Sequence, residues 1–187
     1  MVIPKLDLSK CRILPLVCIF LFYGLGVCQE SNQITLENVV IVTSDKENFG
    51  ERIATKVLAE EVEKRTGLKW ELSAELPESG DRIILSINKT NDSRKFKPEG
   101  YFLKINKEAG RVEISISGAD SRGLLYGVGK FLRMLEWKKG AVNVPENVDI
   151  SSSPAYPIRG HQIGYRTLAN SYDAWTPEIY DQYIREL

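Results

Sequence analysis

Apolar residues recur at strand and helix spacings along most of the chain beyond its N-terminal segment. Val39–Val42 form a continuous β-branched run, which is typical of a strand buried on both faces. Glu51–Thr66 repeat apolar residues at the spacing of an amphipathic helix, and Gly67 follows as a helix stop. Further strands are predicted at Leu68–Ala74 and Arg82–Ile87.

The clearest local pattern is a β-hairpin. Two alternating runs flank a turn at Lys107–Gly110, with apolar positions at Tyr101, Leu103 and Ile105 on one strand and Val112, Ile114 and Ile116 on the other. One face of this hairpin must be covered, and the next helix, from Asp120 to about Trp137, is the expected cover. Its apolar side comprises Leu124, Leu125, Val128, Phe131, Leu132 and Leu135. Glycines lower helix propensity, so we expect Gly123, Gly127 and Gly129 to let this helix approach the sheet closely.

Together these elements predict an α/β fold for residues 34–150, an α+β sandwich in which a mixed sheet is covered by two helices. This region contains no histidine, no glycine-rich phosphate loop after a strand and no ligands at metal spacing. The Gly123–Gly127 stretch lies within the helical pattern, where packing explains it better than nucleotide binding. We therefore expect no cofactor and no metal here.

A different segment begins after Pro154. Tyr156–Gly164 are predicted to form a short strand, and a polar, aromatic loop follows as far as Trp175. Thr176 then caps a helix whose first position is Pro177. A strand, a loop and a helix predict that residues 155–187 are the first βα unit of a larger domain.

The first 28 residues are typical of a secretory signal peptide. A basic segment with Lys5, Lys10 and Arg12 precedes an apolar run from Ile13 to Val27, which is short for a membrane span of about 20 residues. Cleavage after Cys28 would leave Gln29 as the new N-terminus. Two alternatives remain open, an uncleaved membrane anchor and lipidation of Cys28. In each case we expect an exported protein, periplasmic or extracellular, which contacts the membrane only through this segment or a lipid anchor.

Cysteine content and charge narrow the function classes. All three cysteines (Cys11, Cys18 and Cys28) lie in the signal region, so cleavage after Cys28 would exclude disulfides and a thiolate nucleophile. The 25 basic and 25 acidic residues balance, which argues against a nucleic-acid partner. A charge run containing Glu60, Glu61, Glu63, Lys64 and Arg65 is interpreted as the solvated face of the first helix.

Three stretches resemble a known kind of protein. They are Asn38–Thr43 with the following helix, Ile114–Gly127, and Asp149–Ile150 leading to Pro154–Gly160. Together they are similar to the N-terminal accessory domain of family 20 β-N-acetylhexosaminidases and family 67 α-glucuronidases. In those families such a segment leads into the first strand of a TIM-barrel glycoside hydrolase, so the resemblance implies that residues 155–187 are the start of a truncated TIM barrel.

The resemblance also implies a sugar-binding role for residues after Pro154. Arg159 corresponds to the strand-1 arginine with which family 20 enzymes hold sugar hydroxyls, and a guanidinium suits that task because its donors are fixed. An ion pair within the barrel is the structural alternative for Arg159. Family 20 usually has an aspartate where this chain has Gly164, which leaves a uronic-acid substrate or a related family open. His161 would face either the barrel mouth or its packing, and Tyr165, Arg166 and Trp175 fall on the first βα loop, where they would contact sugars or pack the loop.

No catalytic residue is assigned to this chain. Glycoside hydrolysis generally needs positioned carboxylates on later barrel strands, and Asp173 and Glu178 lack that context. We therefore interpret the chain as the N-terminal fragment of an exported glycoside hydrolase acting on glycan or polysaccharide oligomers, inactive by itself. The alternative is an exported non-catalytic module that binds glycans or a partner.

Overall fold

The computed structural model describes residues 33–44, 48–87, 97–108, 110–160 and 175–186. The predicted signal segment lies outside the described residues. Within them the chain forms a mixed α/β fold with two sheets and three helices, so the predicted fold class is confirmed. In the described ranges, no helix has both the length and the apolar character that crossing a bilayer requires.

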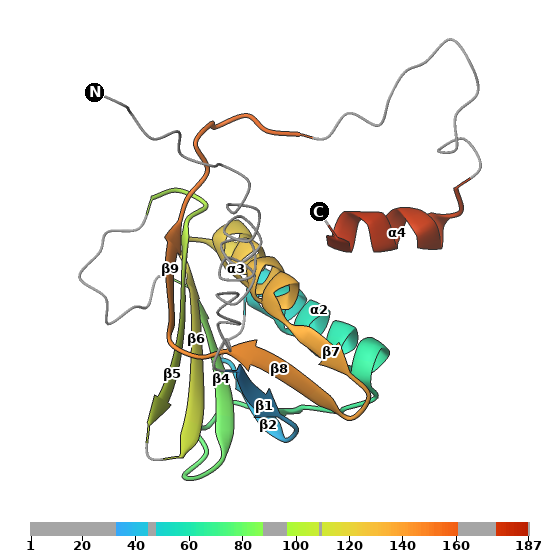
Figure 1. The fold of residues 1–187 in the computed structure, drawn as a ribbon. Helices are drawn as coiled ribbons and strands as arrows, with labels where there is room; N and C mark the ends of the chain where they lie inside the picture. The colour runs from blue at the N-terminus through green and yellow to red at the C-terminus, as the bar shows by residue number, and fades with distance from the viewer. Residues whose placement is uncertain (1–32, 45–47, 88–96, 109, 161–174, 187) are drawn as a thin grey trace, which may run out of the picture. The chain divides into compact units, whose positions relative to one another are not determined.

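The larger sheet has six strands in the order β3-β2-β4-β6-β5-β9 (Figure 1). Its pairs are parallel from β3 to β6 and antiparallel between β6, β5 and β9. The strands are β2 (Val39–Val42), β3 (Glu71–Ser73), β4 (Asp81–Ile87), β5 (Tyr101–Glu108), β6 (Arg111–Gly118) and β9 (Val148–Ser152). The predicted strand at Val39–Val42 and the predicted hairpin are therefore confirmed, whereas β3 is shorter than the predicted Leu68–Ala74.

Strand register aligns the apolar residues in rows across this sheet. Ile83 lies opposite Ile114, and Ile114 lies opposite Ile105 on the other side. All three side chains are buried. Because side chains alternate along a strand, this register places the apolar positions of neighbouring strands on one shared face.

Two helices lie together on one face of this sheet (Figure 1). Helix α2 (Phe49–Thr66) begins with a reciprocal capping box, in which the Asn48 side chain accepts from the Glu51 N–H at 2.9 Å. It ends at Gly67, whose φ of 79° allows its N–H to reach the Glu63 carbonyl at 2.8 Å. The predicted helix and its glycine stop are both confirmed.

Helix α3 (Ser121–Met134) is shorter than predicted and has a narrower buried side. Leu135 has extended backbone angles, and Trp137 lies in a strand opposite Val142. The helical pattern to Trp137 was misleading because pairing with a neighbouring strand overrode the local period. Leu124, Val128 and Phe131 are fully buried, but Leu125 is 36% exposed, so its predicted place on the apolar side was wrong.

A second sheet, which the sequence pattern does not predict, completes the core. It has three antiparallel strands, with the order β1 (Gln33–Leu36), β8 (Ala141–Pro145) and β7 (Glu136–Lys138). Leu36, Val142 and Val144 are fully buried and belong to the same apolar cluster as the main sheet and helices.

Two glycines of α3 permit the close helix-to-sheet contact that the sequence predicts. A Cβ on Gly123 would lie 2.2 Å from the Gly100 carbonyl oxygen, and a Cβ on Gly127 would lie 2.7 Å from the Ile116 Cγ2. Gly129 differs, because a Cβ there would meet only the Arg133 side chain, at 3.4 Å. The prediction is thus confirmed for two glycines and wrong for the third.

The segment after β9 departs from the predicted strand over Tyr156–Gly164. Residues 156–160 form no strand in the structure, and residues 161–164 lie outside the described residues. A strand is held by hydrogen bonds to a neighbour, and none of the described strands pairs with this stretch. Helix α4 (Pro177–Glu186) confirms the predicted helix, with the Thr176 carbonyl accepting from the Ile179 N–H at 3.1 Å. The start of a TIM barrel stays a prediction.

Substituting the two classes of α3 glycine should have opposite effects on stability. Gly123→Ala forces a Cβ against a backbone carbonyl that cannot move without shifting the strand, so we expect the free energy of unfolding to fall by about 1–3 kcal/mol. Gly129→Ala is the matched control, which should be neutral or stabilising by up to about 1 kcal/mol through helix propensity. Urea unfolding of residues 29–187, followed by circular dichroism, measures both. Equal effects would show that helix propensity decides the outcome and not the contact with Gly100.

Candidate functional site

The first candidate site lies where α3 begins, beside the turn that precedes β5. The Asp120 carboxylate accepts two backbone hydrogen bonds, from the Gly123 N–H at 2.8 Å and from the Glu99 N–H at 2.9 Å. One carboxylate therefore caps the helix and ties it to the turn. Burial opposes the ionisation of Asp120, but the bonds from Gly123 and Glu99 outweigh it and lower the pKa of this group.

Glu99 is the centre of this site. Its φ of 55° places a non-glycine residue in the left-handed region, which is uncommon and which the Asp120 contact holds in place. Its carboxylate binds Arg159 and also accepts from Arg122 Nη1 at 2.8 Å. These hydrogen bonds, Arg159 first, lower the pKa of Glu99, so the group is ionised at neutral pH.

Arg159 is therefore held on the surface formed by this turn and α3. Its Nη1 donates to the Tyr156 carbonyl at 2.8 Å, and its Nη2 donates to the Tyr126 hydroxyl at 3.3 Å. The guanidinium also lies over the Tyr126 ring, 5.7 Å from its centroid. About a third of the Arg159 side chain (34%) is still exposed. The sequence indicates Arg159 but carries no local signal for its partners Glu99 and Tyr126, which are distant in the chain.

The other predicted sugar-binding residues are distributed differently. His161, Tyr165 and Arg166 lie outside the described residues. Trp175 packs against α4, with its ring centroid 5.2 Å from those of both Tyr180 and Tyr183. Arg159 thus contacts α3 and the turn before β5, whereas Trp175 contacts α4, and the set of five as a sugar-binding site stays a prediction.

Two further observations bear on chemistry. The pKa of Glu178 is lowered, chiefly by its hydrogen bond with the Thr176 side chain, so this residue is a carboxylate at neutral pH and suits the start of α4. Among the described residues, no three or more histidine, cysteine or acidic side chains cluster in a way that could hold a metal ion.

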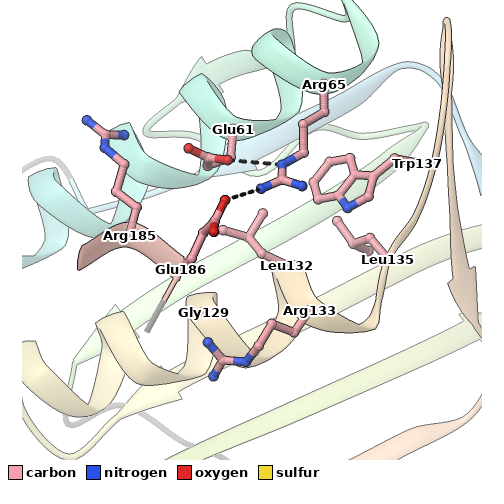
Figure 2. A pocket seen from close by; sticks show the side chains of 9 residues that line it. All are labelled: Glu61, Arg65, Gly129, Leu132, Arg133, Leu135, Trp137, Arg185 and Glu186. Atoms are coloured by element: carbon pink, nitrogen blue, oxygen red, sulfur yellow. Dashed lines mark hydrogen bonds and ion pairs between the residues drawn. The ribbon is translucent and has the colours of Figure 1, made fainter. Parts of the chain in front are cut away.

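The second candidate site is a pocket of about 340 Å³ beside α2, α3 and β7 (Figure 2). Arg65 is its central side chain. Its Nε donates to the Glu61 carboxylate at 3.0 Å, its guanidinium lies 5.1 Å from the Trp137 ring centroid, and its Nη2 is 3.6 Å from a Glu186 oxygen of α4. The remaining lining residues are Gly129, Leu132, Arg133, Leu135 and Arg185.

This pocket corrects one interpretation of the charge run on the first helix. Glu61 is buried, with only 6% of its side chain exposed, so the run is not uniformly solvated. Its burial is compatible with charge because Arg65 pairs with the carboxylate. The sequence carried one signal for this site, a tryptophan close after the glycine-rich helix.

Replacing the Glu99 carboxylate with a neutral group should lower the free energy of unfolding by an amount that depends on pH. A lowered folded-state pKa stabilises the fold above the unfolded value of about 4.3, and that contribution is lost as the pH falls through the folded pKa. Glu99→Gln should therefore unfold more easily than the wild type near pH 7, and the difference should disappear only as the pH falls from about 4.3 through the lower folded pKa. The exposed Glu78→Gln is the control. Denaturant unfolding across this pH range tests it, and a difference independent of pH would indicate a packing defect.

Several solved structures that are similar to this chain have names of glycoside hydrolases. A family 115 4-O-methyl-α-glucuronidase with specificity for decorated arabinogalactans matches 66% of this chain at 16% identity and a TM-score of 0.51, over 18% of its own length. The protein CpGH84B matches 75% of the chain at 22% identity and a TM-score of 0.52, over 23% of its own length. The N-acetyl-β-hexosaminidase of Streptomyces plicatus matches 67% at 20% identity and a TM-score of 0.49, over 23% of its own length.

These matches concern one part of much longer proteins, since the chain spans less than a quarter of each of them. No curated protein matches the chain significantly in sequence. A family description does match it, "Glycosyl hydrolase family 20, domain 2", over residues 27–154. This match covers most of the chain, including both sheets and helices α2 and α3. The chain therefore belongs to the domain family described as domain 2 of glycosyl hydrolase family 20.

Proposed function

We propose that this chain is the accessory part of an exported glycoside hydrolase that acts on glycan or polysaccharide oligomers, and that it does not itself carry the catalytic carboxylates. The observation that carries this proposal is the match of residues 27–154 to domain 2 of glycosyl hydrolase family 20. This domain ends shortly before Arg159, the residue at which the resemblance places the first sugar contact.

The proposal assigns sugar binding to residues that follow the accessory domain. Arg159, His161, Tyr165, Arg166 and Trp175 would contribute hydrogen bonds and aromatic contacts to a glycan. Arg159 suits this role because a guanidinium presents several fixed donors. In the structure Nη1 and Nη2 donate to oxygen atoms of Tyr156, Glu99 and Tyr126, so a sugar would have to share or displace these contacts.

The proposal does not specify which sugar the enzyme cleaves. The names of the similar solved enzymes cover an amino sugar and a uronic acid, and Gly164 stands where family 20 usually has an aspartate. Glycans of either class therefore belong in the test. Export rests on the basic and apolar pattern of the first 28 residues, with a lipid anchor at Cys28 as the alternative to cleavage.

Hydrolysis by the longer protein that contains this chain tests the function. We expect it to cleave 4-nitrophenyl glycosides of N-acetylglucosamine or glucuronic acid, whereas residues 29–187 alone should cleave neither. Arg159→Met should lower kcat/KM by roughly 10- to 100-fold, because it removes charged hydrogen bonds to the sugar. Arg122→Met is the matched control, since it shares Glu99 but lies outside the proposed sugar contacts.

Two results would contradict the proposal. An equal decrease in kcat/KM for Arg159→Met and Arg122→Met would show that Arg159 acts only as an ion-pair partner of Glu99 and does not bind the sugar. Retention of residues 29–187 on a glycan array, with no hydrolysis by the longer protein, would favour a non-catalytic binding module.

The N-terminus of the secreted product tests export. Cleavage after Cys28 predicts a mature chain that begins at Gln29, and mass spectrometry of the N-terminal peptide measures this directly. A diacylglyceryl group on Cys28 would identify the lipid-anchored alternative. A protein that keeps Met1 and stays in the cytoplasm would overturn the export proposal.

A further inference from the structure

Helix α4 has two chemically different sides. At 100° per residue, its polar residues Asp181, Gln182, Arg185 and Glu186 fall on one side. Its apolar residues fall on the other side and are Ile179, Tyr180, Tyr183 and Ile184. Ile179 is 44% exposed and Ile184 is 65% exposed. The helix therefore keeps Ile179 and Ile184 partly in solvent, while its polar side makes the contacts with α2.

The polar side of α4 contacts a row of charged residues on α2. Arg185 Nη1 donates to the Glu60 carboxylate at 2.9 Å, and this bond is the main reason that the pKa of Arg185 is raised. Lys64 donates to the Gln182 side-chain oxygen. About one turn of α2 is thus matched to about one turn of α4.

The third contact uses an arginine that is already held in place. Arg65 is fixed by the Glu61 carboxylate and by the face of Trp137, and from that position it reaches Glu186 at 3.6 Å (Figure 2). A side chain fixed in advance loses little conformational freedom on binding. Arg65 is therefore a better anchor for a carboxylate than a freely rotating surface arginine.

Acidic and basic residues follow one another in opposite order on the two helices, so that each meets an opposite charge. On α2 an acidic residue, Glu60, precedes a basic one, Arg65, whereas on α4 the basic Arg185 precedes the acidic Glu186. Sliding α4 along α2 would bring like charges together, which disfavours other registers.

We propose that Glu60, Lys64 and Arg65 form the surface by which the accessory domain holds and orients the first helix of the domain that follows. The partner is α4, bound through its polar side, which leaves Ile179 and Ile184 available to that domain's own core. This inference rests on the proposed function only for the nature of the following domain. The contact itself is a property of this chain.

Hydrogen exchange of the α4 amides tests the contact in the full chain. A 10-residue helix is marginal in water by itself, so its protection reports docking. Glu60→Arg alters only α2 and should raise α4 exchange by about threefold or more, the scale of a lost surface ion pair replaced by repulsion. Glu63→Arg is the matched control, because Glu63 pairs with Lys69 and not with α4. The double change Glu60→Arg with Arg185→Glu should restore protection.

Each result of the exchange experiment either supports or contradicts the docking of α4 on α2. An α4 that exchanges equally fast in wild type, Glu60→Arg and Glu63→Arg would overturn the proposal, as would a double variant without recovery. Exchange in α3 peptides should stay unchanged, which separates loss of docking from unfolding. A protected α4 in a protein that hydrolyses no glycoside would refute the proposed function while leaving this contact intact.

Discussion

The fold depends on the direct contact between helix α3 and the backbone at the start of the β5–β6 hairpin. The helix can lie there only because Gly123 faces the Gly100 carbonyl and Gly127 faces Ile116. At that distance Phe131 and its apolar neighbours reach the buried rows of the sheet. Closely packed interiors tolerate little added volume, so a side chain at either glycine would separate the helix from the surface that it covers.

The same contact determines how the chain leaves the domain. With α3 fixed against the turn before β5, the Asp120 carboxylate can cap the helix and hold the Glu99 N–H together. Glu99 is then oriented toward two arginines, one on α3 and one, Arg159, beyond β9. The packing of α3 thus fixes the position of Glu99, and Glu99 in turn holds Arg159, a residue that follows the domain.

The sequence predicts the elements whose apolar period matches their final environment. Strand β2, the hairpin, α2 and α4 belong to this group, since local pattern, caps and turns agree. Strand β7 was missed because Trp137 continues the helical period of α3, and only its pairing with Val142 makes it a strand. The candidate sites were harder to predict. Arg159 and Glu99 are 60 residues apart, and nothing local to either indicates the other.

The charge run on α2 shows why charge alone is a poor guide to solvation. Glu61 is buried and paired with Arg65, which lies over the Trp137 ring, whereas Glu60 and Lys64 contact α4. Exposed ion pairs add little to stability individually, so this row contributes little to holding the domain together. The order of its charges, an acidic residue followed by two basic ones, instead distinguishes one register of α4 from its neighbours. Hydrophobic packing therefore stabilises the domain, and the charges on its surface specify the orientation of what is attached to it.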